Sequence, residues 1–312
     1  MSKISKQQQP IHGAVQSLIL LGFGLYIHYL VFSGHINFYI APRMQLYVVM
    51  AGIGLDVMAL YHGMRTFRKY AASKRSSRDS RDPGNHKPAA SPLLRSVLIN
   101  LFFLFPILLG FLTPDRALGS SLAAKKGINL GDAANFRQAM ESSPLVGSGN
   151  PIVGIPSDQK LAEMFPKDEY SGEYANLGIQ LFKKPVINVQ DTGYVEVLSA
   201  LQMYMDNFTN KPIEINGFVY REEGMKPNQF VIARFNIQCC AADAMPLGIL
   251  VESDKAASYA TNSWVHVSGK LGKSNYSDAE VLSINADGMN GIPAPKNVYV
   301  QPQSDFSFVN RM

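Results

Sequence analysis

Long apolar runs are confined to the first third of the chain. Three of them, at residues 11–32, 44–61 and 97–112, approach the roughly 20 residues that a helix needs to cross the hydrocarbon core of a membrane. The third run contains no charged side chain, a composition typical of a membrane-spanning helix rather than of a buried helix in a water-soluble protein. The pattern therefore predicts three transmembrane helices.

Two polar side chains interrupt the first two runs. His28 lies in the first, and Asp56 lies near the middle of the second. Polar groups inside a membrane face other helices and need partners, so both residues should point toward the helix bundle. They could tether the helices by hydrogen bonds or form part of an ion path, and we favour the tether.

Beyond the apolar runs, short segments alternate between apolar and polar residues, at 213–220, 230–239, 247–252, 263–271 and 280–285. Segments of this length, separated by turn residues, are typical of strands, and a 3- and 4-residue apolar spacing at 192–206 predicts a helix before them. Five such strands suit an OB-like β-barrel or a short sandwich. The fold class predicted is a membrane-anchored α+β protein.

The apolar pattern also divides the chain. We expect two transmembrane helices in 1–65, a basic disordered loop in 66–93, the third transmembrane helix in 94–113, a spacer in 114–190 and the OB-like β domain in 191–312. Within the spacer, residues 167–178 read as an exposed loop.

Charge gives the predicted orientation. Residues 1–113 hold 12 Lys and Arg against 3 Asp and Glu, whereas residues 114–312 hold 17 against 21. Positive loops stay in the cytoplasm, so the N-terminus and the loop 66–93 are expected there, and the C-terminal domain outside. The basic loop could lie on anionic membrane lipid, or it only fixes the topology. An acidic C-terminal domain argues against nucleic acid as a partner.

The only two cysteines are adjacent, Cys239 and Cys240, and Asp243 follows. In a continuous strand one cysteine would face the core and the other a polar surface, so both could bind one ion only if the strand ended or bulged at Cys239. A disulfide between neighbouring residues is strained. An uncoupled pair, one reactive or metal-binding thiol, and a vicinal disulfide all remain open.

Two kinds of chemistry could use these thiols. Cys239, Cys240 and Asp243 could join His266, the only histidine beyond residue 113, in a zinc or copper site. A nucleophilic Cys240 would instead need His266 or Arg234 beside it. We find no nucleotide-binding loop, serine nucleophile elbow or Cys-x-x-Cys motif, so an enzyme is the less favoured class.

Strand alternation also predicts an outward face that could bind a ligand or a partner. Besides Cys240 and His266 it comprises Phe218, Tyr220, Arg234, Asn236, Gln238 and Trp264. The alternative is that its aromatic residues pack beneath the helix at 192–206 or beneath the spacer.

Three stretches carry a resemblance to a known family: GFVY at 217–220, RFNIQCCAADAMPLGILVE at 234–252 and WVHVSGKL at 264–271. They resemble the YcgQ-like family of bacterial membrane proteins, whose Cys-Cys-x-x-Asp signature is matched by Cys239, Cys240 and Asp243. The resemblance implies a few N-terminal spans, a helix and a small β domain. It also implies a YcgR-like permease as a membrane partner.

Together these observations favour a multi-pass plasma-membrane protein that serves as the accessory subunit of a permease. Its outer domain would bind a metal ion, another substrate or the partner itself. The alternatives are a thiol-dependent envelope enzyme or redox protein acting through Cys240, and a purely structural role for both cysteines.

Overall fold

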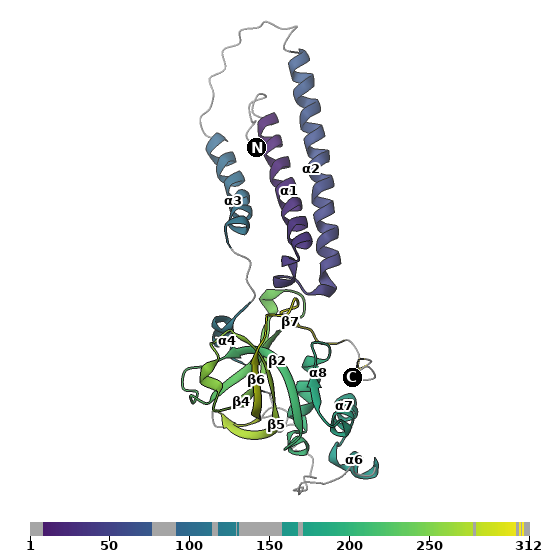
Figure 1. The fold of residues 1–312 in the computed structure, drawn as a ribbon. Coiled ribbons are helices and arrows are strands. Elements are labelled where there is room, and N and C mark those ends of the chain that lie inside the picture. The colour runs from purple at the N-terminus through teal and green to yellow at the C-terminus, as the bar shows by residue number, and fades with distance from the viewer. Residues whose placement is uncertain are drawn as a thin grey trace. The chain divides into compact units, whose positions relative to one another are not determined.

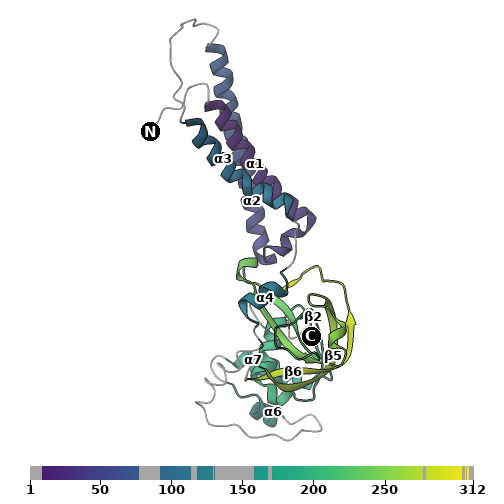
Figure 2. The ribbon, with the colours of Figure 1, turned by 90° about the vertical axis from the view of Figure 1, so that its left-hand side faces the viewer.

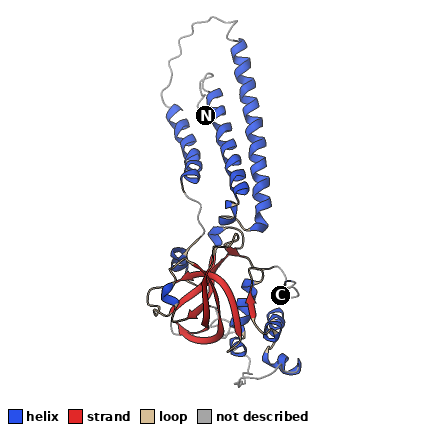
Figure 3. Cartoon of the chain, viewed as in Figure 1, coloured by secondary structure: helices blue, strands red, loops and turns tan. Residues whose placement is uncertain are grey.

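The computed structural model describes residues 9–76, 92–113, 118–128, 130, 158–167, 171–276, 279–303, 306 and 308. The chain forms two compact units, Met1–Arg116 and Ala117–Met312. The first is helical, and the second combines a sheet with short helices (Figures 1 and 3). The α+β part of the predicted fold class is confirmed.

The first unit holds α1 (Gln9–Ser33), the 3-10 turn η1 (His35–Phe38), α2 (Pro42–Ser76) and α3 (Pro92–Leu112). Two segments, Gly13–Ser33 and Pro42–Ala72, are long and apolar enough to cross a membrane. The described apolar part of α3, Ile99–Leu112, is shorter, so the third predicted span is not confirmed.

Helices α1 and α2 pack side by side (Figure 2), and glycines and polar side chains lie at their contact. Ser17 Oγ lies 3.2 Å from His62 Nδ1, and His28 Nε2 lies 2.8 Å from Asp56 Oδ2. The two polar residues that interrupt the apolar runs therefore meet. Large apolar side chains such as Phe32, which is 89% exposed, point away from this contact, as lipid-facing residues do.

The second unit contains seven strands: β1 (Ile187–Val189), β2 (Pro212–Tyr220), β3 (Gln229–Asn236), β4 (Met245–Glu252), β5 (Trp264–Tyr276), β6 (Ala279–Gly291) and β7 (Tyr299–Val300). Its helices are α4 (Ser120–Lys126), α6 (Asp158–Met164), α7 (Gly172–Lys183) and α8 (Tyr194–Met203), with 3-10 turns η2 (Met205–Phe208), η3 (Ala241–Asp243) and η4 (Ala256–Ser258).

The strands pair in the order β1-β2-β5-β6-β4-β3-β7, and β2 also pairs with β3. The pairings thus run from β2 through β5, β6, β4 and β3 back to β2. Only β4 and β6 are parallel among these five. Strands β1 and β7 add parallel pairs at β2 and β3. The predicted strands are present, but β3 ends at Asn236 instead of residue 239.

Strand β3 is buried on both faces, which the alternation rule did not anticipate. Phe230 and Ile232 belong to the main core with Val197 and Leu201 of α8. Phe235 is buried on the opposite side, where its ring stacks 5.5 Å from that of Phe218. The face that includes Phe235, which the alternation predicts to point inward, is buried as expected, but the opposite face is buried as well. Alternation cannot reveal this, because an apolar run buried on two sides carries no alternation to read.

Helix α7 replaces part of the exposed loop expected at 167–178. Ala175, Leu177, Gly178 and Leu181 form its buried face, at helical spacing. This helix packs against α8 beside the sheet. The loop prediction failed because the charged residues Lys167, Asp168, Glu169 and Glu173 precede the apolar stripe, so the segment as a whole looks polar.

A glycine allows β5 and β6 to lie close together where their register shifts, between Ser268 and Gly269. A Cβ on Gly269 would collide with the carbonyl oxygen of Asn285 and lie 2.8 Å from Ala286 Cα. Both obstacles are backbone atoms, so the strands themselves would have to separate.

We predict that Gly269→Ala lowers the free energy of unfolding by about 1–3 kcal/mol, the usual cost of overpacking. Gly291→Ala is the matched control, since a Cβ there meets nothing within 4 Å. Urea unfolding of the purified chain measures both, and equal stability of the two variants would contradict this account of the close approach.

Candidate functional site

A tight turn follows the end of β3 and carries both cysteines. The Asp243 carboxylate organises it, since Oδ1 accepts the backbone N–H of Gln238 at 2.8 Å. Oδ2 accepts the N–H of Cys239 at 2.7 Å and that of Cys240 at 3.3 Å. These three N–H groups therefore bond to Asp243 rather than to a neighbouring strand, which is why β3 stops at Asn236.

The turn brings three ligand atoms together. The two Sγ atoms are 3.7 Å apart, and both cysteines are free thiols. The two sulfurs and a carboxylate oxygen of Asp243 all lie within 4.8 Å of one another. Cys239 is exposed and Cys240 is half-buried, so the prediction that Cys239 faces the core is wrong. The condition for two adjacent cysteines to share one ion, an ended strand, is met.

Electrostatics couple the thiols to the acid. Hydrogen bonding to the anionic Asp243, together with the neighbouring Cys240, raises the pKa of Cys239 to about 11. Burial works to raise the pKa of Asp243, but the bonds it accepts from the Cys239 thiol and from the three backbone N–H groups outweigh burial and lower that pKa to about 2. At neutral pH the turn thus holds a carboxylate and a protonated Cys239.

A lysine that is distant in sequence hydrogen-bonds to the backbone of the turn beyond the cysteines. Lys126, the last residue of α4, donates from Nζ to the carbonyl oxygens of Ala242 at 2.9 Å and Ala244 at 2.7 Å. No sequence motif predicts this contact, because 116 residues separate the donor from the acceptor. Helix α4 therefore positions the turn from within the segment predicted to be a spacer.

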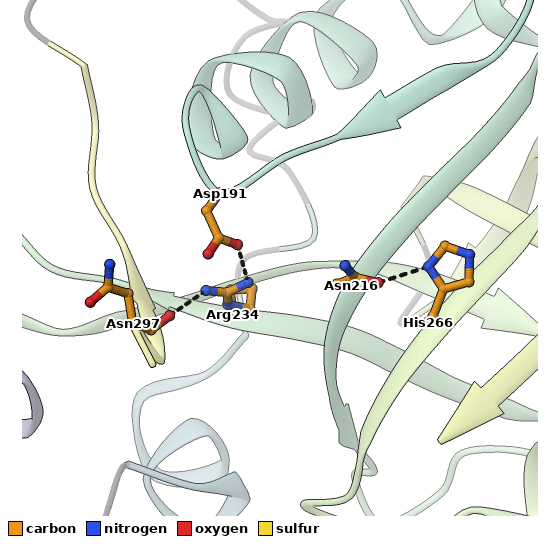
Figure 4. A network of polar contacts seen from close by, with 5 residues as sticks. All are labelled: Asp191, Asn216, Arg234, His266 and Asn297. Carbon is orange, nitrogen blue, oxygen red and sulfur yellow. Dashed lines mark hydrogen bonds and ion pairs between the residues drawn. The ribbon is translucent and has the colours of Figure 1, made fainter. Parts of the chain in front are cut away.

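The structure does not bring His266 into this group. Its Nδ1 lies 2.8 Å from Oδ1 of Asn216, its cross-strand neighbour (Figure 4). Arg234 is engaged elsewhere too, with Asp191 and Asn297. Neither side chain hydrogen-bonds to a thiol in the part of the chain that the structure describes, so neither is placed to activate Cys240.

Arg234 forms a second polar centre. It is 1% exposed, and Nη1 donates to Asp191 Oδ1 at 2.6 Å while Nη2 donates to the carbonyl of Asn297 at 2.9 Å (Figure 4). Its guanidinium lies 5.0 Å from the ring centroid of Trp264 and 5.7 Å from that of Tyr194. Burial of Tyr194 raises its phenol pKa, so this ring is neutral.

A pocket of about 260 Å³ opens beside this centre. It is lined by Asn188, Val189, Gln190, Asp191, Asn216, Arg234, Trp264, Ile292 and Pro295. The predicted outward face thus contributes Arg234 and Trp264 to a real concavity. Asp191 and the amide side chains of Asn188, Gln190 and Asn216 were not predicted to belong to this face. The first three come from β1 and the residues that follow it, and Asn216 comes from β2.

The other members of the predicted face are placed differently. Phe218 and Tyr220 are 4% and 0% exposed, and α4 packs on β2, so these rings are covered as the alternative interpretation expected. Asn236 is the last residue of β3, and its Oδ1 is buried without a hydrogen-bond partner among the described residues. Gln238 is exposed in the cysteine turn.

We predict that Asp243→Asn lowers the free energy of unfolding by about 1–3 kcal/mol, since an amide nitrogen cannot accept from the backbone N–H groups. Asp254→Asn, on an exposed loop, is the matched control and should change little.

The pH dependence checks the same contact. Because the folded-state pKa of Asp243 lies near 2 and its ordinary value is 3.8, the carboxylate stabilises the fold above pH 3.8 and this stabilisation is lost as pH falls toward 2. Thermal unfolding over this window should show the loss in the native chain and not in Asp243→Asn. The same pH slope in both would contradict the role of Asp243.

Comparisons with known proteins identify the family of this chain. Models of the DUF1980 N-terminal and C-terminal domains match residues 15–129 and 164–302. The UPF0703 protein YcgQ of Bacillus subtilis (strain 168) is 24% identical over 292 residues, which cover 91% of this chain and 97% of YcgQ. A Streptococcus mutans serotype c protein, named as a two-component membrane permease complex subunit, is 28% identical over 257 residues, covering 82% of this chain and 87% of that protein. The chain belongs to the DUF1980 family, the YcgQ-like proteins that its cysteine motif indicates.

Proposed function

We propose that this protein is an accessory membrane subunit of a permease complex and that its C-terminal unit binds one metal ion through Cys239, Cys240 and Asp243. The observation that carries the proposal is the meeting of two thiols and one carboxylate within 4.8 Å on an exposed turn. The relative named as a permease complex subunit supports the accessory role.

Membrane placement follows from the helices and the loop charges. In this proposal α1, α2 and α3 each cross the plasma membrane, with the N-terminus and the basic segment 66–93 inside the cell. The unit that starts at Ala117 then lies outside, where a permease would meet its substrate. A YcgR-like permease is the expected partner.

The pairing of β2, β3, β4, β5 and β6 supports an OB-type barrel in this outer unit. In that architecture five strands close into a small Greek-key barrel, and here the pairings return to β2 with only β4 and β6 parallel. The cysteine turn would then be the β3–β4 connection at one end of the barrel. Connections of this kind, held on a rigid strand frame, commonly carry function.

Zinc fits the ligand set best. Two thiolates and a carboxylate supply three of the four positions of tetrahedral zinc, and a water or a ligand from a partner can take the fourth. An open position is what a site that passes metal to a permease requires. Cys239 is protonated at neutral pH and a thiol must lose its proton to bind zinc, so metal binding must release that proton.

A thiol enzyme is less well supported. The raised pKa of Cys239 disfavours its thiolate at neutral pH, and the thiolate is the nucleophile. His266 and Arg234, the residues that could activate Cys240, bond to other partners. A bound metal would reverse this effect by stabilising the thiolates directly.

We predict that the purified full-length chain binds one equivalent of Zn²⁺, and that Cys239→Ser and Cys240→Ser each weaken binding at least 10-fold, about 1.4 kcal/mol. Apparent affinity should rise with pH, because the thiols lose protons on binding. Asp254→Asn is the control and should bind as the native chain does. Competition with a chromophoric chelator gives the affinities, and unchanged affinity in both serine variants would overturn the site.

Labelling of the cysteines can reveal the orientation of the protein in the membrane, because the chain has only two cysteines and Cys239 is exposed. We predict that a membrane-impermeant maleimide labels the native protein in intact cells. In a Cys239→Ser, Cys240→Ser background, Ser80→Cys should be labelled only after lysis. The opposite pattern would place the C-terminal unit inside the cell.

A further inference from the structure

The contact between α1 and α2 contains an ionisable pair. His28 Nε2 and Asp56 Oδ2 lie 2.8 Å apart, with side chains 26% and 24% exposed. Another polar contact between these helices joins Ser17 and His62. Residues 13–33 and 44–64 contain no Lys, Arg or Glu, and Asp56 is their only acidic residue. The pair is therefore the one site in these two apolar stretches that combines an acid with a base.

Two glycines, one on each helix, leave room for this pair. A Cβ on Gly24 would collide with Oδ1 of Asp56, and a Cβ on Gly52 would lie 3.2 Å from Cε1 of His28. Oδ1 of Asp56 is buried and has no hydrogen-bond partner among the described residues. One carboxylate oxygen thus bonds to the imidazole, and the other is enclosed against a glycine with an acceptor site unused.

Stability alone does not account for such a pair. A buried ion pair is often no more stabilising than well-packed apolar residues, and a charge in hydrocarbon costs several kcal/mol. A plain tether between helices needs only uncharged hydrogen-bonding side chains, which contribute about 0.6 kcal/mol on average in membranes. An acid and a base in contact offer a further property, since together they can hold or release a proton.

We propose that His28 and Asp56 form a proton-binding site within the membrane. With one proton bound, the imidazolium and the carboxylate make a pair with no net charge. Loss of that proton leaves a neutral imidazole beside a carboxylate and one net negative charge between the helices. The site would give the permease complex a proton-dependent step, and in this respect it rests on the membrane placement proposed above.

Other titratable groups lie on the elements packed around the pair. Helix α1 also carries Tyr26, which donates to the carbonyl of Gly110 on α3, and Tyr29, whose ring packs at 6.4 Å from that of His35 on η1. On α2 the next groups are Tyr61 and His62 on one side and Tyr47 on the other. Between Ile99 and Leu112, α3 has none.

The test is a pH titration of the full-length chain in lipid vesicles, followed by infrared difference spectroscopy of carboxyl groups and by ¹⁵N NMR of labelled histidine. The native chain should show a titration between about pH 5 and 9 in which the His28 signal changes with the environment of Asp56. Asp56→Asn should shift the midpoint of the His28 titration by at least one pH unit, a 10-fold change in proton affinity.

Two glycine variants distinguish a proton-binding pair from a pair that only holds the two helices together. Gly24→Ala must displace the Asp56 carboxylate without changing any titratable group, so it should also shift the His28 midpoint. Gly54→Ala on α2 is the matched control, because its Cβ meets nothing within 4 Å, and should titrate as the native chain does. Circular dichroism checks that each variant is folded, and His28→Gln identifies the histidine signal and remains informative if Gly24→Ala does not fold.

A His28 midpoint that is the same in the native chain and in Asp56→Asn would overturn the proton site, as would a native chain in which neither residue titrates over this range. Maleimide labelling reports separately on membrane placement. Normal labelling with no shared titration would remove only the proton site, whereas inverted labelling would remove the proposed orientation and leave the pair intact.

Discussion

The three hydrogen bonds that the Asp243 carboxylate accepts from Gln238, Cys239 and Cys240 determine the candidate site. They end β3 at Asn236 and fold the next residues into a turn, so two side chains that a strand would separate come to lie 3.7 Å apart at sulfur. The same carboxylate favours the protonated form of the Cys239 thiol, so the metal binding proposed here requires release of that proton. Asp243 therefore determines the backbone conformation of the turn, the distance between the two sulfur atoms and the protonation of Cys239.

The strands around this turn are covered on both sides. Helix α8 packs on the main core, and the aromatic pair of Phe218 and Phe235 fills the opposite side. Lys126 ties the turn to α4 through two carbonyl groups. If the turn binds an ion as proposed, ligand side chains that are already positioned in this way would lower the cost of binding.

The five main strands, and the meeting of the two polar residues that interrupt the apolar helices, could be predicted from the sequence. Period-2 alternation and long apolar runs can each be read from one short stretch of the chain. The meeting of Cys239, Cys240 and Asp243 was foreseen as conditional on an ended strand, and that condition holds. Local signals could not give the role of Lys126 or the pairing of Arg234 with Asp191, since those contacts join residues 116 and 43 positions apart. His266 was grouped with the thiols on residue type alone, and its cross-strand partner Asn216 shows where its side chain lies.

X-ray absorption spectroscopy of the full-length chain loaded with one equivalent of Zn²⁺ tests the central claim most directly, since it counts the sulfur atoms around the ion. The account predicts two sulfur ligands at about 2.3 Å and oxygen or nitrogen in the remaining positions. A first shell of oxygen and nitrogen alone would show that the ion binds elsewhere, and the cysteine turn would then have to be explained without a metal.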